Sequence, residues 1–324
     1  MALLDVESLC VEFPTRRGIL RALDGVSFSL GRGEILGVVG ESGAGKSLTG
    51  AAIIGLLEPP GRIAGGRILL EGSRIDDLPS ERMRRIRGKQ IGAIFQDPLT
   101  TLNPLYTIGR QLVETMQTHL RLSDREARER SIQWLEEVGI PGARLRIEAY
   151  PHEFSGGMRQ RVVIALALCA EPRLVIADEP TTALDVSIQA QIITLLKRLA
   201  RNHGTSVMLI THDMGVIAET ADRVAVMYAG RIVEIGPVAS VVKEPRHPYT
   251  EGLMGSIPPL DHRVPRLRQI DGSMPRLTAV PSGCAFNPRC PHRFERCVTA
   301  RPELIAAGAT RAACWLYDRE AIHA

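Results

Sequence analysis

Two short stretches of the chain have residue types and spacing suited to binding phosphate groups and a divalent cation. The first follows an apolar run, precedes a predicted helix and reads Gly40-Glu41-Ser42-Gly43-Ala44-Gly45-Lys46-Ser47. Its glycines allow backbone N–H groups to curl around a phosphate, and the N-terminus of the helix adds a favourable dipole. The spacing predicts that Lys46 reaches the β- and γ-phosphates of a nucleotide and that the Ser47 hydroxyl ligates Mg²⁺.

The second stretch is an apolar run that ends in two carboxylates, Leu174-Val175-Ile176-Ala177-Asp178-Glu179. We expect Asp178 to hold Mg²⁺ and Glu179 to act as the general base that polarises an attacking water. Taken alone, adjacent carboxylates at a strand end are also typical of a solvated turn. Together with a phosphate loop, they favour hydrolysis of a nucleoside triphosphate.

A third motif, Ser155-Gly156-Gly157, lies at the start of a predicted helix. An N-cap hydroxyl, free N–H groups and close backbone approach make this a further anion site. One chain rarely needs two cradles for a γ-phosphate. We therefore predict a head-to-tail dimer in which the second cradle of each chain closes over the nucleotide of the other.

The periodicity of the chain predicts the strands and helices that position these motifs. Residues 3–13 alternate like an edge strand, two further strands follow, and a helix is expected from about Lys46. Amphipathic helices are predicted between about residues 104 and 150. From about residue 155 helices alternate with buried strands, which predicts a parallel sheet, and a hairpin is expected to turn at Ala229-Gly230.

The composition excludes several classes of protein. The 324 residues are 44% hydrophobic and 23% charged, with a net charge of +4, which is ordinary for a globular protein and gives no reason to expect nucleic acid as a partner. The longest apolar runs, such as residues 162–170, are shorter than the roughly 20 residues that span a bilayer. The first residues do not read as a signal peptide, so we expect a cytoplasmic location, where thiols stay reduced.

Six cysteines are present, and four of them crowd into the last 41 residues with the spacing C-x5-C-x6-C-x16-C. We expect Cys10 and Cys169, which lie in apolar patterns, to be core residues. In a reducing compartment the crowding of the others suggests metal rather than disulfides. Four thiolates suit an iron–sulfur cluster or zinc equally, although the lack of a C-x2-C pair argues against a common zinc ribbon. Unliganded thiols remain the third alternative.

The phosphate motifs, in this order, resemble those of the nucleotide-binding subunit of an ATP-binding cassette (ABC) transporter, over about residues 1–240. The resemblance implies that Gln96 contacts Mg²⁺ and the attacking water, and that His212 hydrogen-bonds the γ-phosphate. It implies that Asp185, in Ala183-Leu184-Asp185, lies in the loop that crosses the dimer interface. It also implies that Phe13 stacks on adenine.

The same resemblance implies the fold and the full set of site residues. We expect an α/β protein with a P-loop NTPase (RecA-like) core, an antiparallel β subdomain and an α-helical insertion at about residues 97–165. This nucleotide-binding domain covers residues 1–243, and a small Cys-rich C-terminal extension covers 244–324. The expected catalytic residues are Glu179, His212 and Gln96. Those expected to bind ATP and Mg²⁺ are Phe13, Gly40, Glu41, Ser42, Gly43, Ala44, Gly45, Lys46, Ser47, Gln96, Ser155, Gly156, Gly157, Asp178 and Asp185, with Ser47, Gln96 and Asp178 as the Mg²⁺ ligands.

Residues 97–104, residues 244–250 and the cysteine-rich end are similar to the subfamily that energises uptake of oligopeptides and dipeptides in bacteria. This implies two transmembrane permease subunits, an extracytoplasmic substrate-binding protein, and a peripheral location on the cytoplasmic face of the plasma membrane. A second, different ATPase is the expected dimer partner, and pairing with itself is also chemically possible. The subfamily implies a [4Fe–4S] cluster at Cys284, Cys290, Cys297 and Cys314, with zinc as the alternative.

Two other functions are compatible with these motifs. Close relatives within the same subfamily import nickel or another small solute, and the sequence does not select among these cargoes. A soluble ABC ATPase that acts on nucleic acid or ribosomes is a different class. Such proteins tend to carry a long coiled-coil insertion or a second cassette, and the sequence has neither pattern.

Overall fold

The computed structural model describes residues 2–16, 18–182, 184–256 and 269–318. The chain divides into two compact units, which we name the helical unit and the sheet unit. The helical unit comprises Gly31–Glu34 and Asp77–Ile210. The sheet unit comprises Ala2–Leu30, Ile35–Asp76 and Thr211–Ala324.

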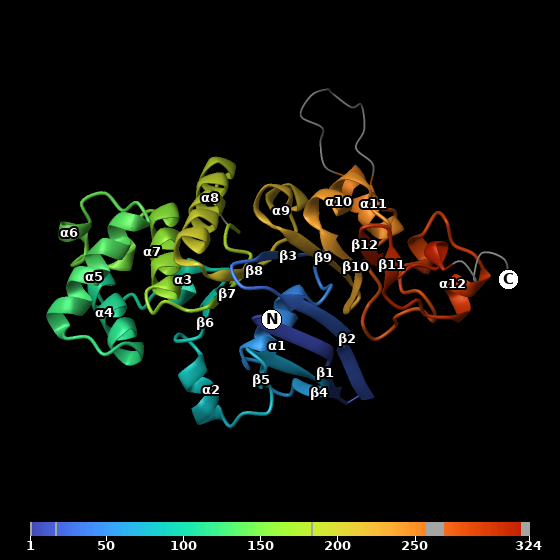
Figure 1. Ribbon diagram of the computed structural model, residues 1–324, viewed down its shortest axis with the longest axis horizontal. Helices are drawn as coiled ribbons and strands as arrows, with labels where there is room; N and C mark the ends of the chain where they lie inside the picture. The colour runs from blue at the N-terminus through green and yellow to red at the C-terminus, as the bar shows by residue number, and fades with distance from the viewer. Residues whose placement is uncertain (1, 17, 183, 257–268, 319–324) are drawn as a thin grey trace. The chain divides into compact units, whose positions relative to one another are not determined.

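The helical unit contains a parallel sheet and a group of helices (Figure 1). Strand β7 (Leu174–Asp178) lies between β6 (Ile91–Ile94) and β8 (Ser206–Ile210) and pairs in parallel with both. The parallel pairing predicted from the alternation of helices and strands is thus confirmed. The helices are α2 (Ser80–Ile86), α3 (Pro98–Thr101), α4 (Ile108–His119), α5 (Asp124–Glu137), α6 (Ala143–Arg146), a 3-10 turn (Pro151–Glu153), α7 (Gly156–Leu168) and α8 (Val186–His203).

Helices α4 and α5 form where the amphipathic pattern predicts helices, and each begins at a capping residue. The Thr107 side chain accepts a hydrogen bond from the Arg110 N–H, and Ser123 forms a capping box with Glu126. Their apolar faces, including the fully buried Met116, pack against each other and against α7. This packing sets the start of α7, where the Ser-Gly-Gly motif lies.

The sheet unit contains an antiparallel sheet in the order β2-β1-β4-β5. Its strands are β1 (Leu4–Thr15), β2 (Gly18–Leu30), β4 (Arg62–Leu70) and β5 (Ser73–Arg74). Strand β1 pairs with β2 on one side and with β4 on the other. The prediction of an edge strand at residues 3–13 is therefore wrong. The alternation that suggested an edge comes from one buried face of a central strand.

A second set of strands in the sheet unit has the order β11-β12-β10-β9-β3. Strands β3 (Ile35–Val39) and β9 (Arg223–Tyr228) pair in parallel, and the other pairs, through β10 (Arg231–Pro237), β12 (Thr310–Ala312) and β11 (Ile305–Ala307), are antiparallel. The predicted hairpin is confirmed: β9 and β10 are joined by Ala229 and Gly230, with φ of 47° and 78°, as a tight hairpin turn requires. The helices of this unit are α1 (Lys46–Ile53), α9 (Met214–Thr220), α10 (Val238–Lys243), α11 (Pro248–Gly255), α12 (Glu295–Thr299), and 3-10 turns at Asn287–Arg289 and Trp315–Tyr317.

A buried carboxylate joins β10 to residues further along the chain. Glu234 is 0% exposed and accepts hydrogen bonds from the N–H groups of Arg246 and His247, at 2.9 and 2.8 Å, and from the Thr310 hydroxyl at 3.2 Å. Burial of an unpartnered carboxylate costs several kcal/mol, and these donors remove that cost. They thereby fix the C-terminal segment, by which we mean the described residues 244–256 and 269–318, to strand β10.

Aromatic rings from β9 and from the C-terminal segment pack against one another. Tyr228 from β9, Tyr249 from α11 and Phe286 are all buried. The Tyr228 ring lies edge-on to the Tyr249 ring at 4.6 Å and to the Phe286 ring at 5.3 Å. Edge-to-face pairs of this kind add to the free energy of burial. The C-terminal segment is therefore part of the core of the sheet unit.

Across the described ranges, no helix is both long enough and apolar enough to pass through a bilayer.

The histidine at the start of α11 makes the stability of the fold depend on pH. His247 is 1% exposed, and burial lowers its pKa to about 3. The unfolded chain binds a proton at this ring below about pH 6.5, whereas the folded chain keeps the ring neutral. The free energy of unfolding is therefore expected to fall as the pH decreases from about 6.5 towards 3.

Replacing His247 by asparagine removes this titration and keeps an acceptor for the Tyr249 N–H, which donates to the ring Nδ1 at 3.1 Å. Between pH 7 and pH 5, we expect His247→Asn to lose about 2 kcal/mol less stability than the parent in urea unfolding. His152→Asn, at an exposed position of the other unit, is the control. Equal losses in the parent and in His247→Asn would contradict the expectation.

Candidate functional site

The phosphate loop connects the end of β3 to the start of α1. All five residues of β3 are buried, and α1 begins at Lys46, as predicted. Gly40, Gly43 and Gly45 have φ of 154°, 82° and 103°, a region that favours glycine. A Cβ at Gly40 would lie 2.3 Å from the Met227 carbonyl oxygen, so the close approach also requires glycine there.

The ammonium of Lys46 lies within the loop. Lys46 is 5% exposed, and its Nζ donates to the carbonyl oxygens of Gly40 at 2.7 Å and Glu41 at 3.1 Å. Ser47, the next residue, is exposed at the first turn of α1. A cation and a hydroxyl at the N-terminus of a helix, after a glycine-rich turn, suit the binding of phosphate and Mg²⁺.

The helical unit brings Gln96 and Glu179 together. Glu179 follows β7 with φ of 46°, and its N–H donates to the Ile210 carbonyl at 2.9 Å. Its carboxylate accepts hydrogen bonds from Gln96 Nε2 at 3.3 Å and from the Thr182 hydroxyl at 2.9 Å. A non-glycine residue in the left-handed region is uncommon, and here it turns the chain at the end of β7. The strand thus ends in Asp178 and a carboxylate whose direction is fixed by two donors.

The Ser-Gly-Gly motif forms the start of α7. Ser155 is the N-cap, and its hydroxyl accepts a hydrogen bond from the Met158 N–H at 3.3 Å. Gly156 and Gly157 are the first helical residues. A Cβ at Gly157 would lie 2.9 Å from Ile188 of α8, so this glycine permits close packing of the two helices. Ser155 and Gly156 are exposed and Gly157 is half-buried, and an anion site needs such access to the start of a helix.

The remaining residues expected to bind the nucleotide come from both units. His212 directly follows Thr211, whose N–H donates to the Val38 carbonyl at 3.1 Å, so His212 lies beside the end of β3. Phe13 lies on β1, with its ring against Gly61. Asp185 is the exposed N-cap of α8, and Ala183, from the same motif, lies outside the described residues.

The last four cysteines line one narrow pocket in the sheet unit. The pocket has a volume of about 10 Å³, and its lining includes Cys284, Cys290, Cys297 and Cys314. Burial raises the pKa of Cys284 to about 11 and that of Cys314 to about 12, so both are protonated at neutral pH. The structure therefore brings together the thiols that the sequence suggests as ligands.

The structure does not confirm a metal site at these thiols. Within the described residues, no group of three or more His, Cys, Asp or Glu side chains is arranged so that it could hold a metal ion. The six cysteines are also free of disulfides. The expectation that Cys10 and Cys169 are both core residues is confirmed for Cys169, whereas Cys10 is only half-buried.

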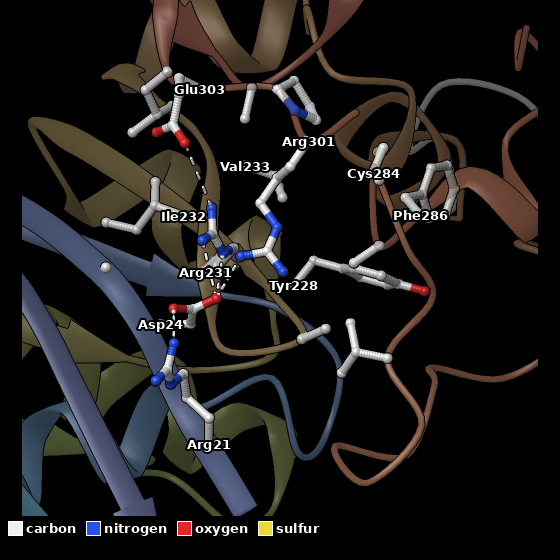
Figure 2. Close-up of a pocket in the computed structure, with 18 of the residues that line it drawn as sticks. Arg21, Asp24, Tyr228, Arg231, Ile232, Val233, Cys284, Phe286, Arg301 and Glu303 are labelled. Atoms are coloured by element: carbon white, nitrogen blue, oxygen red, sulfur yellow. Dashed lines mark hydrogen bonds and ion pairs between the residues drawn. The ribbon is translucent and has the colours of Figure 1, made fainter. Parts of the chain in front are cut away.

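A larger cavity of about 680 Å³ in the sheet unit is lined by charged residues that the sequence analysis did not single out (Figure 2). The carboxylate of Asp24 accepts hydrogen bonds from Arg231 at 2.9 Å, Arg301 at 2.6 Å and Arg21 at 3.4 Å. Burial raises the pKa of Asp24, but the guanidinium groups of Arg231 and Arg301 outweigh it and hold the pKa below its usual value. This network connects the C-terminal segment to β2 and β10.

The chain resembles known proteins over nearly its whole length. The ABC transporter family model matches residues 23–182, and the model of the oligopeptide/dipeptide transporter C-terminal region matches residues 233–297. The dipeptide transport ATP-binding protein DppD of Bacillus subtilis is 50% identical over 99% of this chain and 96% of that protein. The oligopeptide transport ATP-binding protein OppD of Salmonella typhimurium is 49% identical over 96% of this chain and 92% of that protein.

Solved structures agree with these matches. The dimeric, post-hydrolysis state of the ATP-binding cassette MJ0796, bound to ADP and Pi, superposes with a TM-score of 0.65 at 27% identity. The superposed region covers 72% of this chain and 98% of the MJ0796 chain. The fold and the phosphate loop thus define an ATP-binding cassette that hydrolyses ATP. The chain belongs to the ABC transporter family, in the group that contains the dipeptide and oligopeptide transport ATP-binding proteins.

Three contacts of this site were missed by the sequence analysis. The Thr182 hydroxyl bonds Glu179, and Tyr249 and Arg289 both bond Glu41 of the phosphate loop. The position of Thr182, three residues after Glu179, was a usable signal because a turn places such a hydroxyl beside the carboxylate. Nothing in the local sequence points to Tyr249 or Arg289.

Thr182 offers a test of how the carboxylate of Glu179 is positioned. Valine has nearly the same shape as threonine and lacks the hydroxyl, so Thr182→Val leaves Glu179 with one fewer donor. We expect ATP turnover at saturating ATP to fall about tenfold, as for loss of a hydrogen bond to a charged group, with the KM for ATP nearly unchanged. Thr194→Val, at an exposed position of α8, is the matched control. Turnover equal to that of the parent would contradict this role of Thr182.

Proposed function

We propose that the chain is the ATP-hydrolysing subunit of a bacterial importer that takes up dipeptides or oligopeptides through a membrane permease. The observation that carries this proposal is the similarity to dipeptide and oligopeptide transport ATP-binding proteins over nearly the whole length of both chains. The match of residues 233–297 to the C-terminal region of such transporters supports it further. Nickel or another small solute is the alternative cargo.

In this proposal the phosphate loop binds the phosphates of ATP. Backbone N–H groups of Gly40–Ser47 and the ammonium of Lys46 supply the positive charge. Ser47, Gln96 and Asp178 hold Mg²⁺, which neutralises charge that develops on the phosphates. The buried Lys46 and the glycines of the loop support these roles.

Glu179 takes a proton from the attacking water as general base, and His212 donates a hydrogen bond to the γ-phosphate. The hydrogen bonds from Gln96 and Thr182 support the role of Glu179, because they aim its carboxylate. Phe13 stacks on the adenine ring.

The chain acts in a head-to-tail dimer. Ser155, Gly156 and Gly157 bind the γ-phosphate of the nucleotide held by the partner, and Asp185 lies at the interface. The exposed turn at the start of α7 supports this, as does the dimeric state of the similar cassette MJ0796. We expect a second, different ATPase as partner, with self-association as the alternative. Two permease subunits anchor the dimer at the cytoplasmic face of the plasma membrane, and an extracytoplasmic binding protein delivers the substrate.

The four thiols of the narrow pocket bind a [4Fe–4S] cluster in this proposal, and zinc is the alternative. Soft thiolates suit both. The shared pocket supports the idea because residues distant in sequence meet there. A bound metal stabilises thiolates, so its uptake releases protons from Cys284 and Cys314 and is favoured by higher pH.

Glu179→Gln tests the ATPase function of the importer. In proteoliposomes that contain the whole transporter, we expect ATP turnover and uptake of a labelled peptide to fall by about 10²-fold or more, while Mg-ATP binding persists. Glu129→Gln, a half-exposed glutamate of α5, serves as control. Normal turnover in Glu179→Gln would remove this residue from the catalytic role. Uptake of nickel in place of peptide by the parent would overturn the proposed cargo.

Metal analysis of the chain, purified without oxygen, tests the thiol site. We expect iron and acid-labile sulfide in equal amounts, and we expect Cys290→Ser to lose both because one ligand is missing. Cys10→Ser removes a thiol outside the pocket and should keep the parent content. Zinc in place of iron would contradict the cluster, and absence of both metals from the parent would leave four unliganded thiols.

A further inference from the structure

Glu41, the second residue of the phosphate loop, is held by two side chains of the C-terminal segment. Its backbone N–H donates to the Tyr249 hydroxyl oxygen at 2.8 Å. Its carboxylate oxygens accept hydrogen bonds from Arg289 Nη1 at 3.0 and 3.2 Å. Its carbonyl oxygen accepts from Lys46 Nζ. Glu41 therefore lies directly between Arg289 and the lysine of the phosphate loop.

The guanidinium of Arg289 is fixed on every side. The side chain is 7% exposed. Its Nε donates to the Asp271 carbonyl at 2.8 Å, and its Nη1 also lies 3.3 Å from the Tyr228 hydroxyl. Its Nη2 makes longer contacts of 3.4 Å with the carbonyls of Ile270 and Gly272. A planar guanidinium with bonds at each nitrogen loses little further freedom when it binds a carboxylate, so the ion pair is strongly directional.

The chain around Arg289 is held by hydrogen bonds and ring contacts. Arg289 ends the 3-10 turn Asn287–Arg289 and directly precedes Cys290 of the thiol pocket. Asn287 Nδ2 donates to the carbonyls of Ser282 and Cys284, at 3.0 and 2.8 Å, which closes this turn. The buried rings of Tyr228 and Phe286 pack beside the guanidinium. The position of Arg289 is thus set by the cysteine-containing segment.

Arg289 also compensates a charge that opposes phosphate binding. Glu41 brings a carboxylate into a loop that must receive a polyanion, and an uncompensated negative charge there repels phosphate. The half-buried position of the Glu41 side chain, 29% exposed, weakens screening by solvent. A third residue of the C-terminal segment lies close to the same loop, because a Cβ built on Gly43 would lie 3.0 Å from Met274 Cε.

We propose that Arg289 is a positioning residue for the ATPase reaction: it holds Glu41, neutralises its carboxylate and so keeps the phosphate loop ready for ATP. This rests on the proposed binding of ATP phosphates by residues 40–47. Arg289 acts through Glu41 and needs no contact with the nucleotide. The contact with Arg289 therefore raises the affinity for ATP, because a loop that is already ordered loses little conformational freedom when ATP binds.

The test is calorimetric titration of the full-length chain with Mg-ATP, together with steady-state ATPase kinetics of the assembled transporter. We expect Arg289→Ala to raise the Kd and the KM for ATP about tenfold, with kcat little changed. We expect the double variant Glu41→Gln with Arg289→Ala to bind ATP more tightly than Arg289→Ala alone, because the repelling charge is removed. A double variant no tighter than the single one would contradict charge compensation.

Arg301→Ala is the matched control. Arg301 also connects the C-terminal segment to the rest of the sheet unit by an ion pair, but to Asp24, outside the phosphate loop. We expect its Kd for ATP to equal that of the parent. A tenfold loss in Arg301→Ala would show that any loosening of the C-terminal segment has the same effect, and would overturn a specific role for Arg289.

Arg289→Lys keeps the test valid if the alanine variant does not fold. Lysine retains the charge, but it cannot donate to Glu41 and to the surrounding carbonyl groups at the same time. We therefore expect Arg289→Lys to bind Mg-ATP about threefold more weakly than the parent. Binding equal to that of the parent would contradict positioning by Arg289. If the parent itself binds no Mg-ATP, the assignment of the phosphate loop fails. If the parent binds and Arg289→Ala binds equally well, only the role of Arg289 fails.

Discussion

The buried carboxylate of Glu234 is the interaction on which the sheet unit depends. Its two oxygens accept hydrogen bonds from the N–H groups of Arg246 and His247 and from the hydroxyl of Thr310. Glu234 therefore fixes both ends of the C-terminal segment to strand β10. Because α11 begins at this point, the hydroxyl of Tyr249 reaches the N–H of Glu41. The attachment of the C-terminal segment to β10 thus bears on the phosphate loop, the aromatic core and the thiol pocket.

Much of the nucleotide site could be predicted because its chemistry is local in sequence. The glycines of the phosphate loop are required by backbone angles within residues 40–45, and Ser155 caps the helix that it directly precedes. The resemblance to the family implies only that Gln96 contacts Mg²⁺ and the attacking water, and the long-range hydrogen bond between Gln96 and Glu179 is a finding of the structure. Amphipathic helices were predictable from periodicity, since burial of one face imposes it, and the parallel sheet was predictable from continuous apolar runs that alternate with helices.

The features of the fold and of the site that could not be predicted depend on contacts between residues far apart in the sequence, which local patterns do not encode. Strand β1 reads as an edge strand because alternation reports one buried face and says nothing about neighbours on either side. Arg289 and Glu41 are 248 positions apart, so no spacing rule connects them. The crowding of the last cysteines suggested a metal site; the structure brings the four thiols to one pocket, but it does not confirm a metal there, because crowding alone does not determine whether thiols bind a metal.

Hydrogen–deuterium exchange in residues 40–47 tests most directly whether the C-terminal segment holds the phosphate loop. Glu234→Gln keeps the size of the side chain but turns an NH₂ group towards one of the backbone donors, which weakens the attachment of α11. We expect faster exchange in residues 40–47 of this variant, with unchanged protection in α5 of the helical unit. Exchange in residues 40–47 equal to that of the parent, with α11 itself loosened, would contradict it.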